Sequence, residues 1–150
     1  MRLRLLFILA CFFLLLPACG KMDVVHKPAA GIEDAQKLYI IKSDTTKIGF
    51  LEALESWCKK EGVRYEVLPS SANPSDHEWA LTYFGRWSWD LAIFLSNAEI
   101  TAFHNGKQVG QEKLIVGQWD KNKFEKGEKR IHKMMDMLYD KASHYYTSEK

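Results

Sequence analysis

Residues 79–95 carry the most regular hydrophobic pattern of the chain. In this stretch, WALTYFGRWSWDLAIFL, large apolar side chains stand at every second position. A period of two matches the alternation of side chains between the two faces of a β-strand. Within it, Gly85-Arg86 fits a two-residue hairpin turn that has glycine at its first central position. We therefore predict two antiparallel strands that are joined at Gly85-Arg86.

The apolar pattern changes phase after Leu95. From Ala98 onward the apolar residues stand at even positions instead of odd ones. One extra residue in a strand produces such a change, so we predict a bulge or a break near residues 96–97. Asn105-Gly106 is the strongest short hairpin signal in the chain, and residues 108–117 are predicted to return as the next strand.

Two segments have helical spacing instead. Apolar residues three and four positions apart predict helices within residues 45–62 and 122–146. A short apolar run at 38–42 and an alternating run at 63–68 add two strands. The predicted order is β-α-β-β-β-β-α. This order favours an α+β fold, a two-layer sandwich with a mostly antiparallel sheet and two helices packed on one face.

The first 18 residues form a leader in three parts. Two arginines precede an unbroken apolar run over residues 5–16, and Ala18 and Cys19 follow. This is the layout of a secretory signal peptide with a small residue at the cleavage site. Twelve apolar residues span about 18 Å as a helix, well short of the roughly 30 Å hydrocarbon layer. The alternative is a signal peptide that is cut elsewhere and leaves Cys19 as an accidental thiol.

Leu16, Pro17, Ala18 and Cys19 resemble the cleavage pattern of bacterial lipoprotein signals. That resemblance implies cleavage before Cys19 and acylation of this cysteine, palmitate included. Gly20 stands where the family uses Asp to retain a lipoprotein in the inner membrane, which implies the outer membrane and its periplasmic face. The predicted division of the chain is a signal peptide (1–18), a lipidated tether (19–37), a periplasmic domain (38–146) and a tail (147–150).

Charge and cysteine content narrow the possible partners. The formal charge of +2 comes from the two leader arginines, so residues 19–150 hold 19 basic and 19 acidic residues. Nucleic-acid binding needs an excess of Lys and Arg, so no nucleic-acid partner is expected.

With Cys11 in the leader and Cys19 acylated, Cys58 has no cysteine to pair with. We predict a buried thiol there, with a catalytic nucleophile as the alternative.

Residues 86–110, RWSWDLAIFLSNAEITAFHNGKQVG, resemble the core of the Sbal-type small lipoproteins of proteobacteria. The shared pattern is W-x-W-D-L-A, then A-E-I, then a turn with G-K-x-V-G, and it runs here from Trp87 to Gly110. The resemblance covers about residues 38–142. It implies a similar architecture and an envelope location, and it implies no reaction because the family has no established activity.

The predicted sheet offers one candidate binding surface. Trp87 and Trp89 share a strand face and are expected to face the helices and build the core. The alternative is that their rings stack on a sugar or a peptide. The opposite, exposed face of the sheet carries the candidate contacts for a partner, which are Thr82, Arg86, Ser88 and Asp90.

No motif indicates catalysis, a metal site or a cofactor. The histidines lack zinc-ligand spacing, and no nucleophile elbow, Walker loop or Cys-His motif is present. The segment HKMMDM at 132–137 offers soft-metal ligands, but helical packing of its methionines is the simpler interpretation. The basic residues within 121–133 are interpreted as a solvated helix face, with docking on anionic headgroups or peptidoglycan as the alternative.

These observations favour a non-catalytic, outer-membrane-anchored periplasmic lipoprotein. We expect it to be held to the membrane by lipid on Cys19 and to bind an envelope protein or a cell-wall component. The alternative is a periplasmic lipoprotein that binds a small ligand.

Acylation is directly testable by intact mass. We expect the purified protein to begin at residue 19 and to carry the mass of several acyl chains on Cys19. Cys19→Ser removes the acceptor atom, so this variant should lack the increment and leave the membrane fraction. A chain cut at another position, or a Cys19 without added mass, contradicts the prediction.

Overall fold

A computed structural model of the chain describes residues 25–117, 122 and 124–141. The predicted leader, Cys19 and the predicted tail at 147–150 lie outside these residues. The strands are β1 (Val25–Lys27), β2 (Leu38–Ile41), β3 (Tyr65–Leu68), β4 (Trp79–Asp90), β5 (Ala92–His104) and β6 (Lys107–Ile115). The helices are α2 (Ile48–Glu61) and α3 (Gly127–Leu138), and two 3-10 turns are η1 (Ile32–Asp34) and η2 (Pro74–Asp76).

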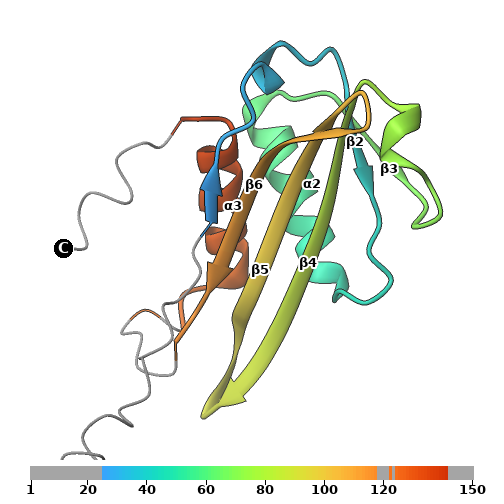
Figure 1. The fold of residues 1–150 in the computed structure, drawn as a ribbon. Coiled ribbons are helices and arrows are strands. Elements are labelled where there is room, and N and C mark those ends of the chain that lie inside the picture. The colour runs from blue at the N-terminus through green and yellow to red at the C-terminus, as the bar shows by residue number, and fades with distance from the viewer. Residues whose placement is uncertain (1–24, 118–121, 123, 142–150) are drawn as a thin grey trace, which may run out of the picture.

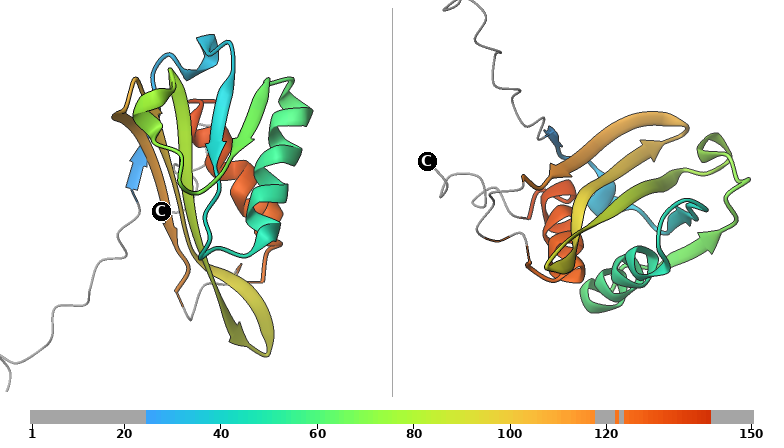
Figure 2. Two further views of the ribbon diagram at one scale, coloured as in Figure 1. Left: turned by 90° about the vertical axis from the view of Figure 1, so that its right-hand side faces the viewer. Right: turned by 90° about the horizontal axis from the view of Figure 1, so that it is seen from below.

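The six strands form one sheet in the order β1-β6-β5-β4-β2-β3. β4, β5 and β6 make an antiparallel meander, whereas β2 runs parallel to both β3 and β4. Both helices lie on the same side of the sheet (Figures 1 and 2). The predicted α+β sandwich, with a mostly antiparallel sheet and two helices on one face, is confirmed.

Each helix buries an apolar stripe against the sheet. α2 contributes Phe50, Leu54 and Trp57, all of them fully buried. It ends at Gly62, whose φ of 70° suits glycine and lets its N–H donate to carbonyls of the last turn. α3 contributes a second set of buried side chains, which are Ile131, Met134, Met135 and Leu138.

The predicted hairpin turn at Gly85-Arg86 is wrong. Both residues lie inside β4, which continues to Asp90, and the chain turns at Leu91 with a φ of 60°. Gly85 serves packing instead. A Cβ at this position would lie 2.6 Å from Cδ2 of Phe50, so only glycine lets the ring pack directly on the strand.

The predicted bulge is confirmed. The β4–β5 register shifts between Arg86 and Trp87, which leaves Ser96 of β5 as the extra residue. The Ser96 hydroxyl donates to the carbonyl of Arg86 at 3.0 Å and accepts from the Ser88 hydroxyl at 2.7 Å. The apolar residues of β5 that face the helices stand at odd positions before the bulge and at even positions after it. Because of the extra residue, both sets lie on the same side of the sheet.

The predicted tether at 19–37 is too long. Within it, β1 pairs with β6, and Ala29 and Ile32 are buried in the core. The Ala29 amide also donates to the Leu138 carbonyl at 2.9 Å. β1 has three residues, too few to show the alternation of apolar and polar residues that marks a strand. Ala29 and Ile32 are isolated buried residues around a turn, so they form no helical or strand pattern either. The sequence therefore offered no signal for this part of the domain.

Substitution of Gly85 tests the close contact with Phe50. Gly85→Ala should lower the free energy of unfolding by about 1–3 kcal/mol, because the added methyl group overpacks the core. Gly49→Ala is the matched control, since no atom lies within 4 Å of a Cβ at that position. It should keep or raise stability by up to about 1 kcal/mol, because alanine favours the helix. Urea denaturation measures both, and equal effects contradict the packing role.

Candidate functional site

The four predicted contact residues share the sheet face that is turned away from the helices. On β4 they alternate with Leu81 and Tyr83, which are buried on the helix side. Asp90 stands eight positions after Thr82, which is about 26 Å along one strand. They form a row and do not converge on a point. This arrangement suits an extended partner better than a small ligand.

Sequence reasoning missed a polar cluster in the middle of this open face. Gln111 Nε2 of β6 donates to Glu99 Oε1 of β5 at 2.9 Å, and the hydroxyl of Thr101 lies 3.4 Å from the same oxygen. The register places Glu99 opposite Phe84 of β4, and the Phe84 side chain is exposed. The open face thus combines hydrogen-bonding groups with an exposed aromatic ring, as protein interfaces do.

The two tryptophans differ in their surroundings. Trp87 is half-buried, and its ring meets Phe50 edge-on with centroids 6.3 Å apart. Trp89 is 73% exposed, so the expectation that both rings build the core is wrong for Trp89. The helix layer ends at the level of Trp87, close to Gly127 at the start of α3. The hairpin of β4 and β5 continues beyond it.

That hairpin ends in an exposed apolar group. Leu91 is 85% exposed and Ile93 is 64% exposed. Ile93 is the cross-strand partner of Trp89. We call Trp89, Leu91 and Ile93 the hairpin tip. Figure 1 shows the hairpin extending past the ends of both helices.

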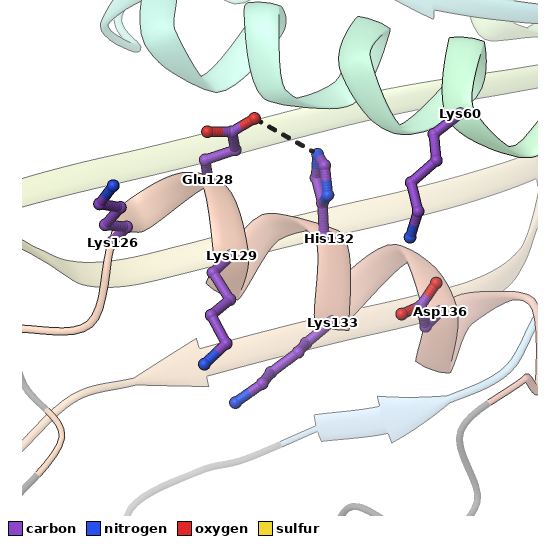
Figure 3. Close-up of a pocket in the computed structure, with 7 residues that line it drawn as sticks. All are labelled: Lys60, Lys126, Glu128, Lys129, His132, Lys133 and Asp136. Atoms are coloured by element: carbon purple, nitrogen blue, oxygen red, sulfur yellow. Dashed lines mark ion pairs between the residues drawn. The ribbon is translucent and has the colours of Figure 1, made fainter.

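A groove with basic walls lies between α2 and α3 (Figure 3). It has a volume of about 290 Å³. His132 Nε2 donates to the carbonyl of Ala53 at 3.1 Å and lies 4.0 Å from Glu128. The lining residues are Lys60, Lys126, Glu128, Lys129, His132, Lys133 and Asp136.

Most charges in the groove already have partners. Glu125 lies 2.9 Å from the ammonium of Lys129 and 3.1 Å from that of Lys133. Burial works against the charged form of Glu125, but these two lysines hold its pKa below the usual value. Asp136 accepts a hydrogen bond from Trp57 Nε1 at 2.8 Å. The groove therefore has only a small excess of positive charge, which can attract an anion weakly.

Metal binding finds no support in the described part of the chain, where no three His, Cys, Asp or Glu side chains gather around a common point. Met134 and Met135 are buried in the core, as the packing interpretation of HKMMDM predicted. Cys58 is also fully buried, and burial raises the pKa of its thiol to about 12. The prediction of a buried thiol is confirmed, and so high a pKa disfavours the thiolate that a nucleophile needs.

A buried carboxyl group was not predicted. Glu112 of β6 faces the helix side, opposite Ile100 of β5, and its side chain is fully buried. Its Oε1 lies 2.8 Å from His26 Nδ1 on β1. Burial raises the pKa of Glu112 to about 7, against the opposing effect of the hydrogen bond with His26. This contact joins the edge strand β1 to the core.

The comparisons with known proteins bear on the fold. No protein-family model matches the chain, and no curated protein matches its sequence. The fold is similar to two solved structures of the PelC dodecamer from Paraburkholderia phytofirmans, one of them of a single-residue variant. Both have a TM-score of 0.51 and 12% identity, and they cover 79% and 80% of this chain and 98% of PelC. At this identity the likeness shows the fold alone.

A third solved structure, a minor lipoprotein from Acinetobacter baumannii, aligns more loosely. Its TM-score is 0.29 at 11% identity, over 69% of this chain and 84% of that one. The score is too low to carry an argument. Separately, none of the helices in residues 25–117, 122 and 124–141 is long and apolar enough to cross a membrane.

The buried Glu112 predicts a pH-dependent stability. Its pKa rises from 4.5 to about 7 on folding, so the folded state favours the protonated form. The free energy of unfolding should therefore fall as the pH rises from about 4.5 to 7, by about 3 kcal/mol at most. Glu112→Gln cannot ionise and should flatten this part of the profile.

The control for this measurement is Glu52→Gln, because Glu52 is exposed on α2. Urea denaturation between pH 4.5 and 8 should give the same slope for the control and the unmodified chain. A Glu112→Gln variant that keeps the full slope would show that another group causes it.

Proposed function

We propose that this protein is a non-catalytic periplasmic lipoprotein, anchored to the outer membrane, that acts as a binding or assembly accessory in the cell envelope. The observation that carries the proposal is the sequence from Leu16 to Cys19, followed only six residues later by the first strand at Val25. Acyl chains on Cys19 would anchor the protein in the membrane, because each buried CH₂ group contributes about 0.8 kcal/mol to membrane binding. The resemblance to Sbal-type lipoproteins supports the same location.

The open sheet face supports the binding role. It offers the row from Thr82 through Arg86 and Ser88 to Asp90, beside the Glu99 cluster. No helix of the described residues covers it (Figure 2). PelC, a chain with this fold, is a dodecamer, so the fold is compatible with assembly into larger structures. An envelope protein or a cell-wall component would contact this face.

The groove between α2 and α3 favours a second candidate function. Its lysines and its volume of about 290 Å³ suit a small anionic ligand. Under this alternative the protein is a periplasmic small-ligand-binding lipoprotein. The open sheet face would then have no direct role.

Crosslinking in living cells separates the two candidates. The tagged full chain is crosslinked, and the proteins that copurify are identified, with Cys19→Ser as the unanchored control. One dominant partner that is lost in the control supports an anchored accessory. The absence of any partner in both forms contradicts the proposal and directs attention to the groove.

Two charge reversals locate the surface that is used. Arg86→Glu changes an exposed residue of the open face, and Lys129→Glu changes an exposed residue of the groove. We expect Arg86→Glu to lower partner recovery by about tenfold, which corresponds to about 1.4 kcal/mol. Lys129→Glu should leave recovery unchanged. The reverse pattern assigns the interaction to the groove.

A further inference from the structure

Exposed apolar side chains concentrate at the hairpin tip. Among the described residues, five large hydrophobic side chains are exposed, and three of them are Trp89, Leu91 and Ile93. An exposed apolar group of this kind indicates a contact with a protein or a membrane. The tip is therefore a candidate contact surface, and its position in the fold indicates which partner it would meet.

Among the described residues, the tip lies beyond the ends of both helices, and the neighbouring Phe94 ring contacts Phe124 at a centroid distance of 6.1 Å. The helix layer ends near Trp87, and Leu91 stands four positions after Trp87, which is about 13 Å of strand. Leu91 holds a φ of 60°, a conformation that glycine or asparagine adopts at lower cost. A turn selected for stability alone would carry one of those residues, so a leucine there indicates a use for its side chain.

The point of chain entry lies at the same end of the sheet. Val25 pairs with Lys113 of β6, and Lys113 pairs with Glu99 of β5. Because β1 runs antiparallel to β6, its first residue is directed toward the end that carries the hairpin (Figure 1). From Glu99 back to Ala92, β5 covers about 20 Å in the direction of the tip.

The chain before Val25 has a matching length. Six Cα–Cα steps separate Cys19 from Val25, and fully extended they span about 22 Å at most. An acyl anchor on Cys19 thus keeps Val25 within that distance of the membrane surface. The hairpin tip extends about 20 Å from the level of Val25, so the length of this segment allows the tip to contact the same surface.

We propose that the hairpin tip inserts into the interfacial region of the membrane that holds the acyl anchor. The inference rests on the proposed acylation of Cys19. Trp89 supplies an amphipathic ring of the kind that is enriched at membrane interfaces, and Leu91 and Ile93 supply apolar side chains. Because the anchor raises the local concentration of membrane at the tip, a weak contact is sufficient.

The charges around the tip fit a lipid surface. Asp90 is the one charged residue between positions 87 and 96, so insertion of the tip removes few charges from water. Behind it, the Lys47 ammonium lies 5.7 Å from the centre of the Trp87 ring, and Arg86 is exposed on the other face. With the tip inserted, these two cations would lie at the level of the lipid phosphates.

The test is a fluorescent probe on the acylated full-length mature protein. Leu91→Cys is labelled with an environment-sensitive dye and reconstituted in vesicles of phosphatidylethanolamine and phosphatidylglycerol. The matched control is Gln108→Cys, an exposed residue at the start of β6, at the opposite end of the sheet. Cys58 is fully buried and should remain unlabelled.

We expect the dye at residue 91 to shift to the blue on vesicles and to lose most of its emission to brominated lipid chains. The dye at residue 108 should do neither. Adding Trp89→Ser and Ile93→Ser should abolish the quenching at 91 without changing the thermal midpoint, because both side chains are exposed.

Each other outcome overturns the inference in a distinguishable way. If intact mass shows acylation but the dye at 91 is as water-exposed as the dye at 108, the tip does not insert and the proposed anchor is unaffected. A blue shift at 91 that is already present without vesicles assigns the tip to a second copy of the protein. An unacylated Cys19 removes both the proposed anchor and the inference.

Discussion

The pairing of β4 with β5 through the bulge at Ser96 is the constraint on which the rest of the structure depends. Without the extra residue, the apolar positions of β5 on one side of the bulge would face water. The two hydrogen bonds of the Ser96 hydroxyl fix the bulge in place. The long hairpin can then present one continuous apolar face to both helices and still extend beyond them.

The two faces of the sheet and the hairpin tip differ in chemistry. The helix side holds the core, with Gly85 allowing Phe50 to lie against the strand and Glu112 joining β1 to the sheet. The open side combines the exposed Phe84 ring with polar side chains that are joined by the hydrogen bonds of Glu99. Of the five exposed large apolar side chains among the described residues, three lie at the hairpin tip, where the sheet extends beyond the helices.

Periodicity predicted the faces of the strands but not their ends. The alternation at 79–95 assigned Thr82, Arg86, Ser88 and Asp90 to one face correctly. It could not show that Gly85 is required by Phe50, 35 positions earlier in the chain, or how far the helices would extend over Trp89. Both depend on tertiary packing. Glu112 had a visible signal, since it occupies an apolar-phase position between Gly110 and Leu114, but its burial depends on β1, which has too few residues to show a pattern.

The place of β1 also decides how the domain responds to force. A pull on Val25 that is directed along the axis of β1 would load the hydrogen bonds between β1 and β6 together in shear and would not open them one by one. Behind them, the amide of Ala29 is bonded to the carbonyl of Leu138, and Ile32 is buried in the core. The first strand, although it is only three residues long, is therefore the mechanical clamp between whatever holds the N-terminal segment and the sheet.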